Sequence, residues 1–251
     1  SPNKVTIVIV VVDIEDDVFR TLSRVTYLAH AAVRLVDTVR ADPVVAYGLL
    51  QVRCQVFLPR FAIVHLVAVI RESRGATFQK VNYQGTSNLL KAAGEAGVKR
   101  FIYVSSGAVY GDANSPDQTL NEDVVPAPKQ LYGITKYASE LVTRRYGELH
   151  GFSTASVRLS TPYGPMERVT GHREVMSAFY HWTGQVVRGE AIQPEALEQG
   201  RDFTYVADIV DGIRAILDAP ELPHDLYNIT AGVWVTLREL LDQLILLSPA
   251  T

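Results

Sequence analysis

Short apolar runs alternate with longer stretches of helical periodicity through most of this chain. Two longer stretches, 85–96 and 132–150, repeat apolar residues every three or four positions, the spacing of one buried helix face. The short runs have the β-branched and aromatic residues of strands buried on both faces. They are Val5–Val12, Ile63–Val69, Phe101–Val104 and Ala155–Leu159. This alternation predicts βαβ units and an α/β fold with a doubly wound, mostly parallel sheet.

The pattern changes from about Pro162, where loops carrying Gly, Pro and charge alternate with short helices. Two helices are expected there, over 208–219 and 237–247, and Thr236 and Glu239 have capping-box spacing at the start of the second. We therefore expect residues 1–161 to form the sheet domain and residues 162–251 to form mainly a small lobe. Residues 14–60 show no pattern from which elements can be predicted.

The composition is that of an ordinary globular protein, with 47% hydrophobic and 20% charged residues among 251, which excludes disorder and coiled coil. A net charge of −3 leaves no broad basic surface for a phosphate backbone, so no nucleic-acid partner is expected. The single cysteine, Cys54, fits a reducing compartment, and the cytoplasm is the expected location. The run Val5–Val12 is too short to span a bilayer, so no membrane association is expected.

Tyr132 and Lys136 form the first candidate for chemistry. Four residues apart on an expected helix, they lie on one face about one turn from each other. A phenol is a poor base near neutral pH, but a nearby ammonium group favours the phenolate. The pair is therefore suited to proton transfer with a hydroxyl or carbonyl substrate. The same spacing also arises by chance in chains rich in tyrosine, so alone it does not establish function.

Ser105 and Ser106 form the second candidate, because they directly follow an expected strand. Hydroxyl groups at the carboxyl end of a strand lie where open α/β sheets bind their ligands. A serine there can hydrogen-bond a substrate oxygen and orient a proton transfer. The alternative is an ordinary serine-glycine turn.

These two segments, in this order, resemble the extended short-chain dehydrogenase/reductases, and more narrowly the NAD-dependent sugar-nucleotide epimerase/dehydratase family. Further stretches resemble motifs of that family in the family's order. They are His65-Leu66-Val67-Ala68, Val81-Asn82-Tyr83-Gln84-Gly85-Thr86, Arg158-Leu159-Ser160-Thr161-Pro162-Tyr163-Gly164, Arg201-Asp202-Phe203-Thr204-Tyr205 and Tyr227-Asn228-Ile229. The ordered set implies a Rossmann-like doubly wound parallel sheet with a small C-terminal substrate-binding lobe.

The resemblance implies a role for residues of each motif. Tyr132 would be the catalytic acid/base, Lys136 would lower its pKa and hold the nicotinamide ribose, and Ser106 would complete a catalytic triad. The substrate would contact Ser106, Tyr163 and Arg201, whose planar guanidinium suits a diphosphate. The other cofactor-binding residues would be Asp13, Leu66, Val67, Ala68, Asn82 and Ser105.

The reaction implied by the resemblance transfers hydride from a sugar carbon to NAD while Tyr132 takes the hydroxyl proton. In an epimerase the keto-sugar intermediate rotates in the site, and hydride returns to its opposite face. Dehydratases of the family typically carry Asp-Glu where this chain has Gly107 and Ala108, so dehydration is not expected. The resemblance thus implies an NAD-dependent epimerase for a nucleotide-sugar, forming a homodimer through the helices near Gly85 and Tyr132.

Two other functions stay open. One is a ketoreductase or dehydrogenase, dependent on NAD or NADP, that acts on a sugar nucleotide or another small carbonyl compound. The other is a non-catalytic relative that binds or regulates. Ser106, Tyr132 and Lys136 argue against the non-catalytic relative, and a missing glycine motif argues for it.

That missing motif is the family's phosphate-binding loop, Gly-x-x-Gly-x-x-Gly after the first strand. No glycine precedes Gly48, although such a loop brings backbone close to a pyrophosphate. The run Val5–Val10 continues directly into Val11-Val12-Asp13, which resembles the end of another strand, and neighbouring parallel strands need a crossover of about a dozen residues. Either a segment is absent from this sequence or the protein has lost the loop. The crossover argument favours an absent segment.

Individual residues refine these expectations. Asp13 as a ribose ligand would repel a 2′-phosphate and make NADP the less favoured cofactor, whereas a solvated acidic turn is the equal alternative. Val67 replaces an expected alanine near the cofactor, and Thr161 stands where the family often has asparagine. The histidines show no paired spacing that suits zinc, so no metal is expected, and His65 is expected in the core or a turn.

Overall fold

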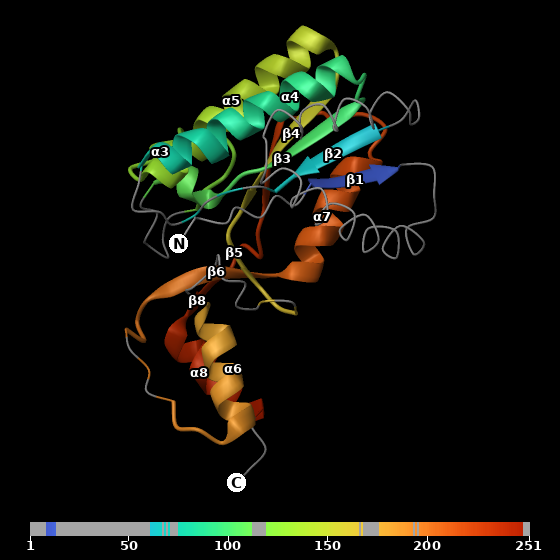
Figure 1. Ribbon diagram of the computed structural model, residues 1–251. Helices are drawn as coiled ribbons and strands as arrows, with labels where there is room; N and C mark the ends of the chain where they lie inside the picture. Colours follow the sequence, from blue (N-terminus) through green and yellow to red (C-terminus); the bar gives the residue numbers. More distant parts are fainter. Residues whose placement is uncertain are drawn as a thin grey trace, which may run out of the picture.

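The computed structural model describes residues 9–13, 61–66, 68, 70, 75–111, 119–165, 167, 176–192, 194 and 196–247. In this part of the chain, a five-stranded sheet and a three-stranded sheet form two bodies (Figure 1). The larger sheet has the strand order β1-β2-β3-β4-β7. Its strands are β1 (Ile9–Asp13), β2 (Phe61–His65), β3 (Arg100–Val104), β4 (Ser153–Leu159) and β7 (Leu226–Ile229).

Strands β2, β3, β4 and β7 run parallel, as the alternation of strands and helices predicts. Strand β1 is antiparallel to β2, with Ile9 opposite His65 and Asp13 opposite Phe61. The expectation that this region holds the ends of two parallel strands is therefore wrong for its described part, which is one continuous strand. An apolar run specifies a buried strand but not its direction, so the sequence alone could not distinguish the two arrangements.

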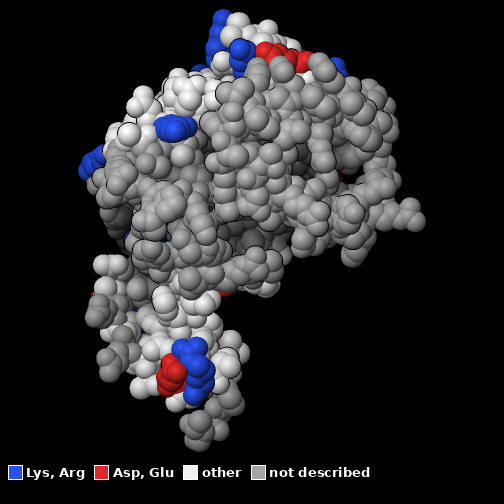
Figure 2. Space-filling view, in the orientation of Figure 1, with Lys and Arg blue, Asp and Glu red and all other residues white. Residues whose placement is uncertain are grey.

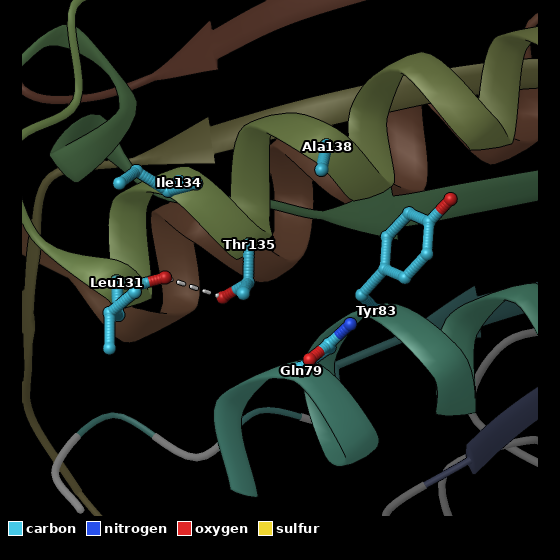
Figure 3. A pocket seen from close by; sticks show the side chains of 6 residues that line it. All are labelled: Gln79, Tyr83, Leu131, Ile134, Thr135 and Ala138. Atoms are coloured by element: carbon cyan, nitrogen blue, oxygen red, sulfur yellow. Dashed lines mark hydrogen bonds between the residues drawn. The ribbon is translucent and has the colours of Figure 1, made fainter. Parts of the chain in front are cut away.

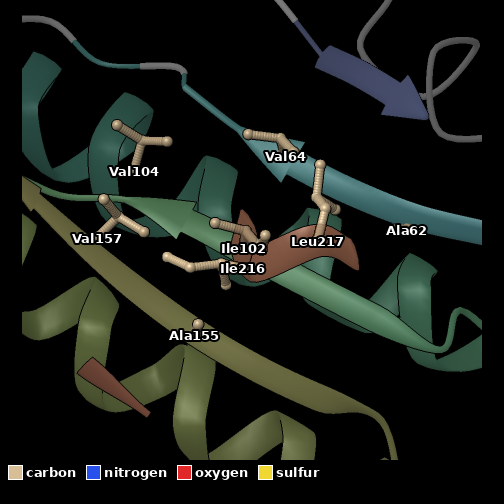
Figure 4. Packing of buried hydrophobic residues seen from close by; sticks show 8 residues of the cluster. All are labelled: Ala62, Val64, Ile102, Val104, Ala155, Val157, Ile216 and Leu217. Atoms are coloured by element: carbon tan, nitrogen blue, oxygen red, sulfur yellow. The ribbon is translucent and has the colours of Figure 1, made fainter. Parts of the chain in front are cut away.

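Alternate residues of the central strands point to opposite faces, and each face carries its own core. One face packs against α7 (Val206–Asp218); Figure 4 shows this cluster, which comprises Ala62, Val64, Ile102, Val104, Ala155, Val157, Ile216 and Leu217. The other face packs against α4 (Gly85–Glu95) and α5 (Leu131–His150). That second cluster includes Ile63, Phe101, Tyr103, Leu90, Ala93 and Phe152. Helices on both faces of the sheet confirm the doubly wound, Rossmann-like fold.

The helices that border the site begin and end at identifiable signals. Helix α5 ends where Gly151 adopts a left-handed conformation with φ of 72°, which glycine accepts without the cost of a side chain. Helix α4 is preceded without interruption by a short α-helix and a π-helical segment, α3 (Gly75–Phe78) and η1 (Gln79–Gln84). Single turns of π-helix are frequent at functional sites.

The small lobe contains a second sheet, in the order β5-β6-β8, and two helices. Its elements are β5 (Thr161–Tyr163), α6 (Ala178–Arg188), β6 (Gly200–Tyr205), β8 (Trp234–Thr236) and α8 (Leu237–Leu247). The capping box of α8 is confirmed: Thr236 N donates to Glu239 Oε2 at 2.8 Å and Glu239 N to Thr236 Oγ1 at 3.1 Å. The chain passes from β4 of the large sheet to β5 of this lobe at Ser160, and α7 and β7 return to the large sheet.

Asp202 joins the two bodies at their junction. Its Oδ1 accepts hydrogen bonds from Ser160 Oγ at 3.0 Å and Ala231 N at 3.1 Å, and its Oδ2 accepts one from Gly232 N at 2.8 Å. Ser160 lies where β4 passes into β5, and Ala231 and Gly232 lie between β7 and β8. One carboxylate therefore holds two of the three crossings between the domain and the lobe, β4 to β5 and β7 to β8; the third runs from β6 to α7.

Among the described residues on the face shown in Figure 2, charged side chains do not gather by sign. Over the top of the large domain and on the small lobe, acidic and basic side chains lie side by side. No helix in the described residues is long and apolar enough to cross a bilayer.

We predict that Arg100→Met lowers the free energy of unfolding by about 3 kcal/mol, because it leaves buried carbonyl groups without their charged donor. Arg100 is buried, and its Nη1 lies 2.6–2.8 Å from three carbonyl oxygens at the C-terminal end of α7: those of Ile216, Leu217 and Ala219. Urea unfolding measures the change. Arg145→Met is the control; this arginine forms an exposed pair with Glu148, and its loss should cost under about 0.5 kcal/mol. Equal effects of the two changes would contradict the capping role.

Candidate active site

Ser105 and Ser106 leave the sheet at the carboxyl end of β3, as expected. Ser105 N donates to the Val157 carbonyl at 2.7 Å, which continues the pairing with β4 for one more residue. Ser106 then caps a 3₁₀ turn, η2 (Gly107–Tyr110), because its Oγ accepts a hydrogen bond from Ala108 N at 3.2 Å. Ser106 is therefore fixed at the edge of the sheet rather than carried on an open loop.

Tyr132 lies in the first turn of α5 beside Ser106. Burial raises the pKa of the Tyr132 phenol above its ordinary value, and a hydrogen bond with the Ser106 side chain lowers it in part. The sequence predicts the opposite net direction, with Lys136 lowering the pKa of Tyr132. That expectation is not met in this structure, because the cost of burying the phenolate exceeds the stabilisation that its neighbours supply.

Lys136 is 2% exposed, one turn after Tyr132 on the buried side of α5. Its Nζ donates to the Val104 carbonyl at 2.6 Å and lies 4.8 Å from the centroid of the Tyr103 ring and 6.0 Å from that of Tyr132. Burial lowers the pKa of Lys136 to about 7, and the negative charge of Glu140 opposes this change. The amine therefore titrates near neutrality, which is the range in which a proton-transfer device is useful.

Gly133 allows α5 to approach the turn that carries Ser106. A Cβ atom at this position would lie 2.5 Å from the Ala108 carbonyl oxygen and 3.0 Å from Pro128 Cβ. Any larger residue would therefore push the helix and the turn apart. The close approach of Tyr132 to Ser106 depends on this glycine.

Asn82 lies in η1, fully buried against α5. Its Nδ2 donates to Thr135 Oγ1 at 3.1 Å, and its carbonyl oxygen accepts a hydrogen bond from Ser139 Oγ at 2.9 Å. Thr135 and Ser139 flank Lys136 on the helix. The structure thus brings Asn82 to the helix face that carries Lys136.

The segment after β2 reaches the same edge of the sheet. His65, the last residue of β2, stands opposite Tyr103 of the parallel strand β3, so Leu66 leaves the sheet near Ser105. Leu66 is 40% exposed, Ala68 is half-buried, and Val67 lies outside the described residues.

Asp13 is not brought to this edge. It stands opposite Phe61 at the start of β2, whereas the site residues follow the end of β2 and β3. The antiparallel direction of β1 places its last residue at the far end of the sheet. The expected cofactor contact of Asp13 therefore has no support in the geometry.

His65 is buried and belongs to the support of the site. Its Nε2 lies 2.9 Å from Thr86 Oγ1, and burial together with the charge of Lys136 lowers its pKa to about 3. The ring is therefore neutral near pH 7. A core position agrees with the sequence-based expectation for this histidine.

Tyr163 and Arg201 lie on the small lobe. The Tyr163 ring stacks on Phe179, with centroids 4.3 Å apart, and Arg201 lines a cavity of about 380 Å³. The other residues lining that cavity are Glu198, Gln199, Gly200 and Trp234. None of the hydrogen bonds and ring contacts among the described residues joins Tyr163 or Arg201 to Tyr132.

Glu140 and Arg158, to which no sequence motif gave a role, form an ion pair beneath Ser105. Arg158 Nε lies 3.0 Å from Glu140 Oε1 and Nη2 lies 2.7 Å from Oε2, and Ser105 Oγ donates to Oε1 at 2.5 Å. Two signals pointed to them: Glu140 follows Lys136 by four residues, and Arg158 interrupts an apolar strand. A charge in a buried strand needs a partner.

A separate groove of about 480 Å³ lies between η1 and α5 (Figure 3). Gln79 and Tyr83 line it from η1, and Leu131, Ile134, Thr135 and Ala138 line it from α5. This groove is mainly apolar and does not include Ser106, Tyr132 or Lys136. No group of His, Cys, Asp and Glu among the described residues could hold a metal ion.

A model of the NAD dependent epimerase/dehydratase family matches residues 54–230, which is more than half of the chain. This chain belongs to that family. The match includes Ser106, Tyr132, Lys136 and Arg201, and it begins after the stretch that contains Asp13.

Curated relatives and solved structures include both types of family enzyme. The chain is 34% identical over 181 residues to dTDP-D-glucose 4,6-dehydratase of Mus musculus, covering 71% of this chain and 48% of that protein. It is 30% identical over 174 residues to an uncharacterised UDP-glucose epimerase, YtcB, of Bacillus subtilis (strain 168), covering 66% and 52%. The chain spans about half the length of the curated relatives it matches.

A solved structure of an epimerase has a similar fold to this chain. The UDP-glucose 4-epimerase of Thermotoga maritima, determined with UDP-glucose, superimposes with a TM-score of 0.67 and 26% sequence identity. The similarity covers 80% of this chain and 65% of that one.

We predict that Gly133→Ala destabilises this family member by about 1–3 kcal/mol, because the new methyl group overlaps the Ala108 carbonyl. Gly184→Ala in α6 is the matched control: the three atoms nearest its Cβ all belong to the movable Arg188 guanidinium, the nearest at 3.0 Å. Alanine is the better helix former by up to about 1 kcal/mol, so the control should be stabilised. Urea unfolding compares the two, and equal stabilisation would show that Gly133 makes no restrictive contact.

Proposed function

We propose that this chain is the catalytic part of an NAD-dependent sugar-nucleotide epimerase. The observation that carries the proposal is the placement of Ser106 and Lys136 around Tyr132 at the carboxyl end of β3. Two hydroxyl groups and an amine that titrates near neutrality suit proton exchange with a sugar hydroxyl. Membership of the family supports the choice of a nucleotide-sugar as substrate. The cytoplasm stays the expected location.

The described residues fit one end of a dinucleotide. Tyr132, Lys136 and Asn82 gather polar groups at the sheet edge where an α/β domain binds ligands, and they would hold the nicotinamide ribose. NAD supplies the hydride acceptor and donor at this site. The pyrophosphate end is expected to need a glycine-rich turn, and the sequence has no glycine before Gly48.

The structure does not support the preference for NAD over NADP. The preference for NAD rested on Asp13, which stands at the opposite end of the sheet from Ser105. Titration of the protein with both reduced cofactors, followed by their fluorescence, decides between them.

Proton transfer in the proposed reaction passes through Tyr132. The substrate hydroxyl would be oriented by Ser106, whose Oγ is already held by its capping bond to Ala108 N. The phenolate oxygen of Tyr132 would accept the hydroxyl proton as the sugar is oxidised and return it when the keto-sugar is reduced on its other face. Lys136, in its protonated form, would favour the phenolate that this step requires.

Epimerisation is proposed over dehydration because Gly107 and Ala108, the residues after Ser106, offer no carboxylate to remove a ring proton or protonate a leaving hydroxyl. Glu140, the acid close beneath, is occupied by Ser105 and Arg158. A panel of nucleotide-sugars separates the reactions: an epimer indicates epimerase, loss of water indicates dehydratase, and lasting formation of NADH indicates dehydrogenase.

We predict that Tyr132→Phe lowers turnover by about 10²–10⁴-fold, the usual contribution of a general acid–base group, while the fold is kept. Tyr137→Phe is the control, because Tyr137 lies on the same helix and is likewise partly exposed. Product formation is measured by chromatography and folding by circular dichroism. Full activity of Tyr132→Phe would refute the mechanism. A parent protein without turnover or NADH binding would instead point to the non-catalytic relative.

We also propose that two copies of the chain associate through α4 and α5, the helices from which a homodimer is expected. The apolar groove between η1 and α5, with Leu131 51% and Ile134 43% exposed beside it, supports this choice. Ile134→Glu should reduce the sedimenting mass from twice 27.7 kDa to that of one chain. Val210→Glu, on an exposed position of α7, should leave the mass unchanged. A monomeric parent would contradict the proposal.

A further inference from the structure

The Glu140–Arg158 ion pair is a costly element that the proposed proton transfer does not use. Arg158 is 2% exposed and Glu140 is 6% exposed, so both charges have lost their water. The pair is bidentate, with contacts of 3.0 and 2.7 Å. Replacing a buried ion pair by apolar residues is often neutral or stabilising, so stability alone does not explain its presence.

The ion pair contacts the active-site segment at the end of β3 through Glu140. Glu140 lies one turn after Lys136 on the buried side of α5, and its Oε1 accepts the Ser105 hydroxyl at 2.5 Å. Lys136 in turn donates to the carbonyl of Val104, the residue before Ser105. Glu140 and Lys136 are therefore fixed to neighbouring residues at the end of β3.

Arg158 holds the carboxylate in this orientation. It approaches from β4, where its guanidinium lies 4.5 Å from the centroid of the Tyr110 ring. Two of its nitrogens bind Glu140, and the third, Nη1, has no hydrogen-bond partner among the described residues. Glu140 thus accepts three hydrogen bonds, one from Ser105 and two from the Arg158 guanidinium, the bidentate geometry of a charge-assisted pair.

We propose that Glu140, held by Arg158 and Ser105, is a positioning residue that keeps Lys136 positively charged inside the active site. Without a nearby negative charge, a fully buried ammonium group loses its proton because it has no water to solvate it. A neutral Lys136 could not stabilise the Tyr132 phenolate. Glu140 thus acts on Tyr132 only through Lys136. Its relevance to catalysis rests on the function proposed above.

The other titratable groups around Lys136 do not supply this charge. His65 on β2 is neutral near pH 7, because burial and Lys136 itself lower its pKa to about 3. Burial raises the pKa values of Tyr103 on β3 and Tyr132 on α5, so both phenols keep their protons. Arg158 on β4 is positive and therefore cannot supply a negative charge. Among the described neighbours, the negative charge therefore comes from Glu140.

The test measures the ionisation of Lys136 directly. The full chain is labelled with ¹³C at the Cε atoms of its six lysines and titrated by NMR, and the Lys136 signal is identified by its loss in Lys136→Met. In the parent protein Lys136 should titrate near pH 7, well below the other lysines. In Glu140→Gln its pKa should fall by at least about one unit, the effect of removing an opposite charge at close range.

A second variant keeps the test decisive if Glu140→Gln alone does not fold. Glu140→Gln combined with Arg158→Met removes both buried charges and leaves none unpaired. In this double variant the pKa of Lys136 should be lower than in the parent protein. It should be higher than in Glu140→Gln, because that single variant also carries the unpaired positive charge of Arg158. Glu148→Gln is the matched control, because Glu148 is an exposed carboxylate on the same helix and should leave the titration of Lys136 unchanged.

The outcomes separate this inference from the proposed function. The NMR titration needs neither NAD nor a nucleotide-sugar. Absence of turnover in the parent therefore overturns the proposed function but leaves the inference about Glu140 and Lys136 standing. A Lys136 pKa that is unchanged in the folded double variant overturns the inference, even if the parent is an active epimerase. Where the parent is active, the pH profile of kcat in the double variant should shift in the same direction as the pKa of Lys136.

Discussion

The hydrogen bond from the Lys136 ammonium group to the Val104 carbonyl is the constraint on which the site depends. It ties the start of α5 to the end of β3 at 2.6 Å, in a place where Lys136 is 2% exposed. Tyr132 lies one turn before this point and Glu140 one turn after it, so both are positioned by the same contact. The bond also places a charge where water cannot solvate it, and the surrounding groups have to compensate for that cost.

The close packing of α5 against the sheet and η1 requires small side chains on the helix face between them. The residues of α5 that face the sheet and η1, at intervals of four, are Thr135, Ser139, Thr143 and Gly147, all small and buried. A Cβ atom at Gly147 would lie 2.6 Å from Thr154 Cγ2, so β4 lies directly against the helix backbone. The hydroxyl groups of Thr135 and Ser139 donate hydrogen bonds to carbonyl oxygens of their own helix, and Ser139 also donates to the carbonyl oxygen of Asn82. Lys136 is the long side chain beside this row, and it fills the space at the end of β3.

The sequence predicted the elements well where periodicity was sustained. The expected helices 85–96 and 132–150 are observed as Gly85–Glu95 and Leu131–His150, because each has an apolar or small face of constant spacing. The direction of β1 could not be predicted, since a valine run pairs equally well either way. The serine, tyrosine and lysine of the site were found because a family motif lies in short segments. Glu140 and Arg158 were not, because 18 residues separate them and their pairing appears only when α5 and β4 are packed together.

The ionisation of Tyr132 and that of Lys136 are parts of one equilibrium. A neutral amine beside a neutral phenol contains the same number of protons as an ammonium beside a phenolate, so converting one form into the other needs no change of pH. With Arg158 and Glu140 cancelling each other, the ammonium-phenolate form also brings the buried cluster to zero net charge, whereas a protonated Lys136 beside a neutral Tyr132 leaves one uncompensated positive charge. The buried ion pair therefore does not set the net charge of the cluster. It orients the local field, with the negative end of the pair on the same helix as Lys136 and the positive end on β4. On the inference that Glu140 keeps Lys136 charged, this direction favours the ammonium form of Lys136.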